Sequence, residues 1–312
     1  MMQKLKTEVL QRMIRAGVSS LEIDFLLSIG RRQDNTGCIH GVYYKDIMDE
    51  IGCSAQHFYD ILRSLERKGI IKYEKASYYD YDITVIGNEF PEGLPIRCGY
   101  ISLNKGMYCQ EFRELRAGEK LLAMELLRRQ DIQFRMAQKP SLCYITANFY
   151  NKFCSLLGVT KRVLRSYLKN LEDFFAIGEK AGYLYVTPLK RSYSVDMGAP
   201  TDQALYGEQE VLTICRRNRI QPYGYGDHAV RDTAALLTQY RPRALELGFD
   251  LLEILKGCII RSVGKGYGLS ARQRRLEPPL IHKLLQNYMN GYHSFSNPEG
   301  ICQSIEKNLS VF

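Results

Sequence analysis

The sequence contains no tryptophan, and none of its apolar stretches comes near the ~18 residues that a membrane-spanning helix needs. We therefore expect no membrane contact. No CxxC pair occurs, and the nine cysteines are scattered and odd in number. This pattern argues against a disulfide framework or a zinc ribbon and is typical of reduced thiols in a cytoplasm. The first residues mix charged with apolar side chains, so we expect no secretory signal and a cytoplasmic protein.

Motifs of enzymatic chemistry are also missing. Neither GxSxG nor HExxH occurs, and Cys38 and His40 have no second pair at metal-ligand spacing. The stretch VGKGYGLSARQRR at 263–275 lacks the hydroxyl residue that follows GK in a phosphate loop, which favours a flexible basic loop. Asp227 and His228 follow a Gly/Tyr-rich segment that is typical of a turn with a polar cap. We predict no enzyme activity, no cofactor and no metal.

The composition is that of a globular protein with a basic surplus. Its 312 residues are 45% hydrophobic and 25% charged, enough for two or three domains. Lys and Arg total 43 against 34 Asp and Glu, a formal charge of +9. This surplus favours anionic partners, above all nucleic acid.

The main organising signal is an internal repeat. Residues 43–75 and 149–182 match at an offset of 106 without a gap, and residues 22–34 match 119–131 at an offset of 97. The second copy thus has nine extra residues, which we assign to a connecting loop. The positions that recur are Tyr43 and Phe149, Ile47 and Phe153, Ile51 and Leu157, Gly52 and Gly158, Ser54 and Thr160, Leu62 and Leu168, and Leu65 and Leu171.

Each copy predicts the same series of elements. An apolar helix, begun in the first copy by a Ser19–Glu22 capping box, is followed by a short helix that ends at glycine. Ser54 or Thr160 then caps a third helix, and two β-like runs form a hairpin. The stripes of the short helices are Tyr43, Ile47 and Ile51 in one copy and Phe149, Phe153 and Leu157 in the other.

This order is typical of a winged helix-turn-helix. The predicted fold class is mainly α with small β-hairpins (α+β), with two winged helices in tandem followed by an α-helical domain. We expect the domains at 1–100, including an amphipathic helix over 3–16, at 101–195, and at 204–312 after a linker at 190–203. Use of the repeated unit as a scaffold or protein-interaction module stays open.

The third helix of the second copy carries the strongest nucleic-acid signal. Its apolar stripe faces inward, so its other positions face the major groove. The wing adds Lys180 at its tip, with Lys190 and Arg191 after it. The expected contacts on the helix are Thr160, Lys161, Arg162, Arg165, Ser166 and Lys169.

The first copy gives a weaker signal. Its candidate contacts are Ser54, Gln56, Tyr59 and Arg63, whereas Asp60 would repel phosphate. The following turn at 77–82 is acidic and aromatic, which makes it a poor phosphate clamp and leaves a protein contact as the alternative. In the C-terminal region, phosphate contact and a solvated surface are equally open for Arg216, Arg217, Arg219, Arg272, Arg274 and Arg275.

Residues 20–191 resemble the tandem winged-helix DNA-binding proteins, which include plasmid replication initiators and regulators of bacterial mobile elements. The resemblance implies that Ser54–Arg67 and Thr160–Leu171 are two recognition helices on successive grooves of one repeat site. It also implies that a dimer could repress its own promoter. The acidic first wing and the helical third domain depart from the family pattern.

These observations predict sequence-specific binding of double-stranded DNA through two recognition helices. A transcription regulator is our first expectation, and a plasmid or mobile-element replication initiator is the alternative. A winged-helix protein-interaction adaptor is the further alternative. The expected partner is double-stranded DNA, and a homodimer stays open.

Overall fold

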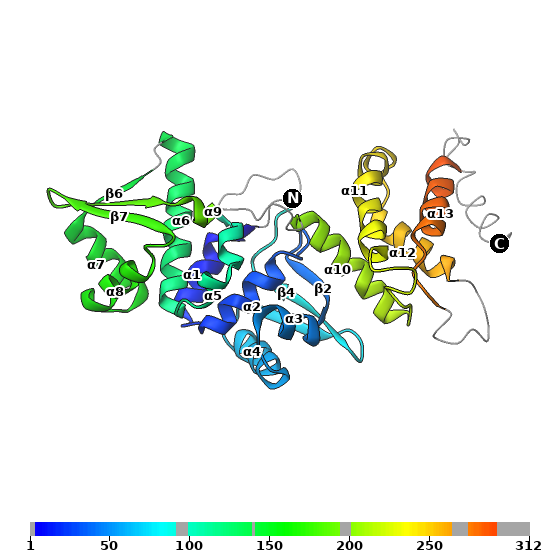
Figure 1. Ribbon diagram of the computed structural model, residues 1–312, viewed down its shortest axis with the longest axis horizontal. Coiled ribbons are helices and arrows are strands. Elements are labelled where there is room, and N and C mark those ends of the chain that lie inside the picture. Colours follow the sequence, from blue (N-terminus) through cyan, green and yellow to red (C-terminus); the bar gives the residue numbers. More distant parts are fainter. Residues whose placement is uncertain (1–3, 92–98, 139–140, 194–200, 264–273, 292–312) are drawn as a thin grey trace. The chain divides into compact units, whose positions relative to one another are not determined.

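The computed structural model describes residues 4–91, 99–138, 141–193, 201–263 and 274–291 (Figure 1). The chain divides into two compact units, Met1–Tyr206 and Gly207–Phe312. Both copies of the repeat lie in the first unit. The expected class, mainly helical with small antiparallel sheets, is confirmed.

The two copies have the same order of elements and the same strand order. In each, a helix, a strand and two helices precede a hairpin, and the hairpin's second strand is the centre of a three-stranded antiparallel sheet. The first copy consists of α2 (Ser20–Gly30), β2 (Cys38–Tyr43), α3 (Tyr44–Ile51), α4 (Ala55–Arg67), β3 (Ile71–Lys75) and β4 (Asp80–Val85). The second consists of α6 (Ala117–Ala137), β6 (Leu142–Ile145), α7 (Thr146–Leu157), α8 (Lys161–Asn170), β7 (Phe175–Lys180) and β8 (Tyr183–Pro188).

The local signals that define the helix ends are confirmed. Ser19 and Glu22 form the reciprocal capping box at the start of α2. Ser54 and Thr160 cap α4 and α8 with their hydroxyl oxygens. Gly52 and Gly158 end the preceding helices in the left-handed conformation, which glycine adopts without steric cost.

The sequence reasoning missed the first strand of each sheet. Tyr43, predicted on a helical stripe with Ile47 and Ile51, instead ends β2, and its neighbour Tyr44 begins α3. The register of β2 on β4 is interrupted between Ile39 and Val42, so the strand lacks a regular alternation. A short, irregular strand of this kind depends on its partner for its conformation, and its sequence alone does not reveal it.

The nine extra residues of the second copy do not form a loop, so that prediction was wrong. They lengthen two helices: α6 has 21 residues where α2 has 11, and α7 has 12 where α3 has 8. The connection from α6 to β6, residues 138–141, is shorter than that from α2 to β2, residues 31–37. Good helix formers such as Arg, Gln, Met and Ala continue through the added stretch of α6, so the helix continues.

The predicted helix over 3–16 begins only at α1 (Thr7–Arg15). Before it, β1 (Lys4–Lys6) pairs with β5 (Tyr100–Ser102), with Leu5 opposite Ile101. This pairing brings together residues far apart in the sequence, and it overrides the local helical period. Two short helices, η1 (Lys105–Tyr108) and α5 (Gln110–Arg113), then lead to α6.

The two copies share one core, which is built around α2 and α6. Every residue from Glu22 to Gly30 and from Glu119 to Leu127 is buried, so these segments of the two helices lie inside the unit. Lys120 on α6 is fully buried and donates to both carboxylate oxygens of Asp24 on α2, at 2.6 and 2.7 Å. Burial raises the pKa of Asp24 and lowers the pKa of Lys120, each against the attraction of its partner.

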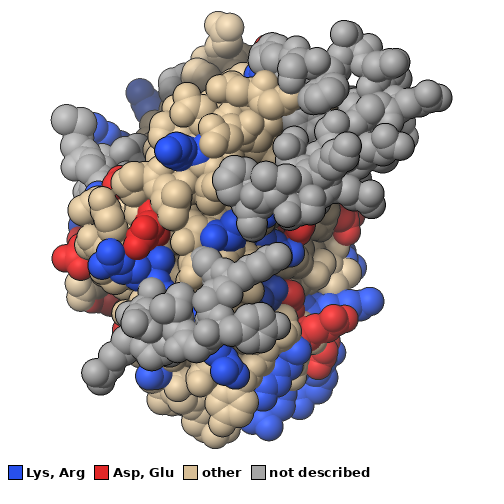
Figure 2. Space-filling model, turned by 90° about the vertical axis from the view of Figure 1, so that its right-hand side faces the viewer, with Lys and Arg blue, Asp and Glu red and all other residues tan. Residues whose placement is uncertain are grey.

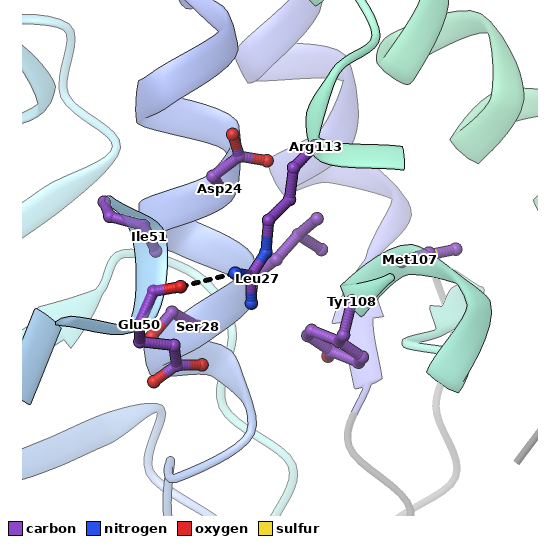
Figure 3. Close-up of a pocket in the computed structure, with 8 residues that line it drawn as sticks. All are labelled: Asp24, Leu27, Ser28, Glu50, Ile51, Met107, Tyr108 and Arg113. Carbon is purple, nitrogen blue, oxygen red and sulfur yellow. Dashed lines mark hydrogen bonds between the residues drawn. The ribbon is translucent and has the colours of Figure 1, made fainter. Parts of the chain in front are cut away.

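A small cavity lies beside this pair (Figure 3). Its lining includes Asp24, Glu50, Tyr108 and Arg113, and Arg113 donates to the backbone carbonyl of Glu50. The enclosed space is sufficient for about one water molecule. It is too small for a cofactor or an organic substrate, so it belongs to the packing of the core.

The second unit is helical, as predicted for the C-terminal region. Its helices are α10, which begins in the first unit (Asp202–Arg217), α11 (Ala229–Leu247), α12 (Leu251–Ser262) and α13 (Pro278–Gly291). They surround a separate apolar core that includes Val211, Leu255 and Leu285. The basic stretch at 263–275 lies mostly outside the described residues, as does the middle of the predicted linker at 190–203. No described helix is both long and apolar enough to cross a membrane.

The buried pair predicts an asymmetric response to mutation. Lys120→Met alone should destabilise the protein by about 3–5 kcal/mol, because it leaves the Asp24 carboxylate buried without a partner. The double variant Asp24→Leu, Lys120→Met should recover most of that loss, since it removes both charges. Urea unfolding followed by circular dichroism measures both. Equal destabilisation by the single and double variants would contradict this reading.

The left-handed turn before α8 gives a second prediction. Gly158 has φ +64 and open space around it, so Gly158→Ala should cost about 1–2 kcal/mol from backbone strain alone. Gly178 also has open space but lacks a positive φ, so Gly178→Ala should leave stability nearly unchanged. The two variants are compared by urea unfolding. A similar effect of both would exclude the turn as the cause.

Candidate nucleic-acid interface

Helix α8 has two different faces. Leu164 and Leu168 are buried, and Leu171 follows them at the C-cap, so the predicted apolar stripe faces the core. The outward positions Lys161, Arg162, Arg165, Ser166 and Lys169 are all exposed. The exposed side of this helix therefore has the composition predicted from the sequence.

The position of α8 is set by contacts with the start of α6. The Tyr167 ring lies directly over Gly118, where a Cβ would come within 2.5 Å of the tyrosine hydroxyl oxygen. Asn170 Nδ2 donates to Glu119 Oε1 at 2.7 Å. These positioning residues were not predicted, because their partners are about 50 residues away in the sequence.

The cations of α8 have no carboxylate partner within salt-bridge distance among the described residues. This holds for Lys161, Arg162, Arg165 and Lys169, although other Arg and Lys residues in the same unit do form such pairs. Arg165 instead lies over the ring of Tyr150, with 5.4 Å between the guanidinium carbon and the ring centroid. The contact with Tyr150 restrains the Arg165 side chain, but it leaves the positive charge of the guanidinium without an anionic partner in the part of the chain that the structure describes.

This arrangement costs the helix stability. Lys161 and Arg162 occupy the first turn, where the helix dipole favours anions. Lys161 and Arg165 are four residues apart, as are Arg165 and Lys169, and like charges at this spacing repel. Cations that disfavour their own helix and have no carboxylate partner are typical of a binding surface.

The hairpin of the second copy presents Lys180 at its tip. Lys180 and Tyr183 pair across a two-residue turn of Ala181 and Gly182, both with positive φ. This is the turn geometry that suits a tight hairpin. The turn is also tied to α7, because the amide of Thr146 donates to the carbonyl of Gly182 at 2.9 Å.

The two cations after the hairpin differ in their surroundings. Both lie on the short helix α9 (Lys190–Tyr193). Lys190 is exposed, whereas Arg191 forms an ion pair with Glu111 on α5. Arg191 thus already has an anionic partner, and its part in a nucleic-acid contact is weakened.

The corresponding helix of the first copy, α4, is satisfied internally. The Asp60 carboxylate accepts from Gln56 at 3.0 Å and from Arg63 at 2.7 Å, which occupies both predicted base-reading side chains. The hydroxyl of Ser54 accepts from the amide of His57 as the cap. The polar side chains of α4 therefore have partners within their own helix, whereas the cations of α8 have no carboxylate partner among the described residues.

The remaining candidate of the first copy, Tyr59, belongs to an aromatic cluster. Its ring lies 6.3 Å from the rings of both Tyr44 and Tyr81. At the turn between β3 and β4, Tyr78 and Tyr79 are 82% and 55% exposed. This hairpin turn is aromatic and acidic, in agreement with its sequence.

Net charge separates the two copies further. From β2 to the end of β4 the first copy has six basic and eight acidic residues, a net charge of −2. From β6 to the end of β8 the second has six basic and three acidic residues, a net charge of +3. An anionic ligand would therefore favour the second copy.

In the second unit, the two predicted basic clusters lie side by side. Gln221 pairs with Arg275 in a parallel bridge, which brings the segments after α10 and before α13 together. Arg219 is exposed, whereas Arg275 pairs with Glu277 at 2.9 Å. Arg272 lies outside the described residues. Figure 2 shows Lys and Arg beside Asp and Glu at several places on the face it views, so its basic character is interrupted.

Among the described residues, no group of three or more His, Cys, Asp or Glu side chains could hold a metal ion. Comparison with known proteins finds no matching family model, no matching curated protein and no matching solved structure. The candidate interface consists of α8 and the hairpin that follows it, and their geometry and charge define it.

The unfavourable placement of the α8 cations gives a prediction about stability. Lys161→Glu should stabilise the protein by about 0.5–1 kcal/mol at low salt, because an anion suits the first helical turn and pairs with Arg165. The gain should shrink as salt is added. Thermal unfolding at two salt concentrations measures it. A loss of stability would mean that Lys161 has a structural role.

Proposed function

We propose that the two copies are winged helices and that the chain binds double-stranded DNA, with α8 in the major groove. The order of elements supports this, since each copy has the helix-turn-helix and the three-stranded sheet of that fold. The glycine turns at Gly52 and Gly158 join the two helices of each motif.

One observation carries the proposal: four exposed cations on α8 lack acidic partners among the described residues, while its opposite face is buried. Arginine can bind guanine with two hydrogen bonds, and lysine neutralises phosphate. Arg165, near the middle of the helix and supported by Tyr150, is our choice for base contact. Lys161, Arg162 and Lys169 are assigned to phosphate or base edges nearby.

The hairpin supplies a second contact in this proposal. Lys180 lies at its tip, where it can neutralise a phosphate beside the groove that α8 occupies. The first copy has a smaller role, because Asp60 holds Gln56 and Arg63. We assign it contacts through Ser54 and Tyr59 at the edge of the site.

We propose transcription regulation as the biological role. A replication initiator is the second candidate, because two copies joined by one core suit a repeated site on DNA. Footprinting separates the two roles. Protection of the gene's own upstream region supports a regulator, and protection of a nearby repeat array supports an initiator.

The central test is mutation of Arg165. A duplex is first selected from a random pool with the full-length protein. Arg165→Ala should then weaken binding by about 1–3 kcal/mol or relax the base preference at one position. Arg63→Ala is the matched control: it removes an arginine already paired with Asp60 and should have little effect. Fluorescence anisotropy on matched and mismatched duplexes measures both. Unchanged affinity and preference in Arg165→Ala would place α8 outside the groove.

Salt titration of the same duplex separates DNA binding from the adaptor alternative. Neutralising about six phosphates predicts a log–log slope near −5. A flat response, or no selected duplex, would favour a protein-interaction adaptor.

A further inference from the structure

The sheet of the second copy has an exposed face of which the proposed duplex contact uses only Lys180, at one end. The strand register places Cys143, Tyr185 and Gly178 in one row, and Ile145, Tyr183 and Lys180 in the next. Tyr183 and Tyr185 are 45% and 41% exposed, and Ile145 is 51% exposed. The alternate positions Leu142, Leu184 and Val186 are buried, so the two faces of the sheet are clearly distinguished.

The same face of the first copy carries different side chains. There, Lys72 lies opposite Thr84 and Glu74 lies opposite Asp82. Counted from the first pair of each hairpin, which is Ile71 with Val85 in one copy and Phe175 with Pro188 in the other, the equivalent rows of the second copy are Ala176 opposite Thr187 and Gly178 opposite Tyr185. Two acidic residues, Glu74 and Asp82, thus occupy the positions that Gly178 and Tyr185 occupy in the second copy. Because the first copy folds with aspartate at the position of Tyr185, the fold itself does not require a tyrosine there. A ligand that contacts Tyr185 would explain it.

We infer that this face, defined by Tyr183, Tyr185, Ile145, Cys143 and Lys180, binds unpaired bases of single-stranded nucleic acid by stacking. Tyr183 and Tyr185 are two residues apart on the central strand, so their side chains leave the same face about 7 Å apart. Each ring can take one base, and stacking on aromatic side chains accepts any base.

The surroundings of the tyrosines suit this ligand. Cys143 lies opposite Tyr185 on the neighbouring strand, and the proximity of its thiol raises the pKa of Tyr185. The adjacent strand carries Gly178 instead of a bulky side chain, which leaves room beside the Tyr185 ring. An exposed aromatic ring with open space beside it can accept a stacked base.

Charge also favours nucleic acid. Lys180 lies at one end of this face, and the acidic residue of the same strand, Glu179, alternates to the other side, where it accepts from Thr146. Among the described residues of the three strands, no carboxylate lies on the tyrosine face. The corresponding face of the first copy has Glu74 and Asp82, with His40 3.5 Å from the latter, and would repel phosphate.

This inference extends the proposed function and rests on it for the class of ligand. Lys180 belongs both to the tip of the wing and to the edge of the tyrosine face. A strand that leaves the duplex beside the wing would therefore reach the tyrosines directly. The two surfaces remain separable by mutation, because α8 carries none of the residues of the tyrosine face.

The test measures binding of a fluorescent oligo-dT of about 16 nucleotides, which forms no duplex, to the full-length protein by anisotropy at low salt. The double variant Tyr183→Leu, Tyr185→Leu keeps apolar side chains but loses both rings. We expect it to bind oligo-dT about tenfold more weakly or worse, and to bind the selected duplex with unchanged affinity. Tyr185→Asp, which introduces the residue of the first copy, should have a similar effect.

The matched control is Tyr78→Leu, Tyr79→Leu, which removes two exposed tyrosines from the first wing and should leave oligo-dT binding unchanged. Thermal unfolding confirms that each variant is folded. Failure of the wild type to bind oligo-dT, or equal binding by the tyrosine-face variant, would overturn the inference while leaving duplex binding by α8 intact. Self-association of the wild type that the Tyr183 and Tyr185 variant abolishes would assign the face to a second copy of this chain instead.

Discussion

The packing of α2 against α6 depends on each partner of the ion pair between Asp24 and Lys120, which joins the buried segments of the two helices. Such a pair is expensive to bury, and neither partner can be lost alone without a large penalty. It therefore specifies how α2 meets α6. Because each of these helices begins one copy of the repeat, the pair also determines how the two copies share a core. Gly118 and Glu119, beside Lys120, then position α8 through Tyr167 and Asn170.

On this shared framework, the two copies have diverged at their surfaces. In the first, Asp60 binds the polar side chains of α4, and the outer face of the sheet is charged and solvated. In the second, the cations of α8 are left without anionic partners among the described residues, and the outer face of the sheet carries two exposed tyrosines. The two copies thus show that this arrangement of elements forms with different exposed side chains. The proposed ligand accounts for the exposed cations and tyrosines of the second copy.

Much of the local structure follows from short-range chemistry. The caps at Ser19, Ser54 and Thr160 and the turns at Gly52 and Gly158 depend on a few adjacent residues, and all were predictable. Contacts across the sequence were not. Strands β2 and β6 need their partners in order to form, and β1 exists because β5 lies beside it. The extra residues of the second copy lengthen α6 and α7, because a helix can continue by making its own hydrogen bonds, whereas the residue count alone was taken to indicate a loop.

The sequence by itself determined the repeat, the helix ends and the cationic composition of α8, because these depend on the order of neighbouring side chains. Only the tertiary structure decided which cations have anionic partners. Arg63 and Arg165 occupy comparable helices, yet one pairs with Asp60 and the other lies over Tyr150. Likewise, the pairing of Arg191 with Glu111 and the row of Tyr185 with Gly178 arise from packing and strand register. Electrostatic attraction and stacking fall steeply with distance, so the partner that folding brings near determines what each side chain can still bind.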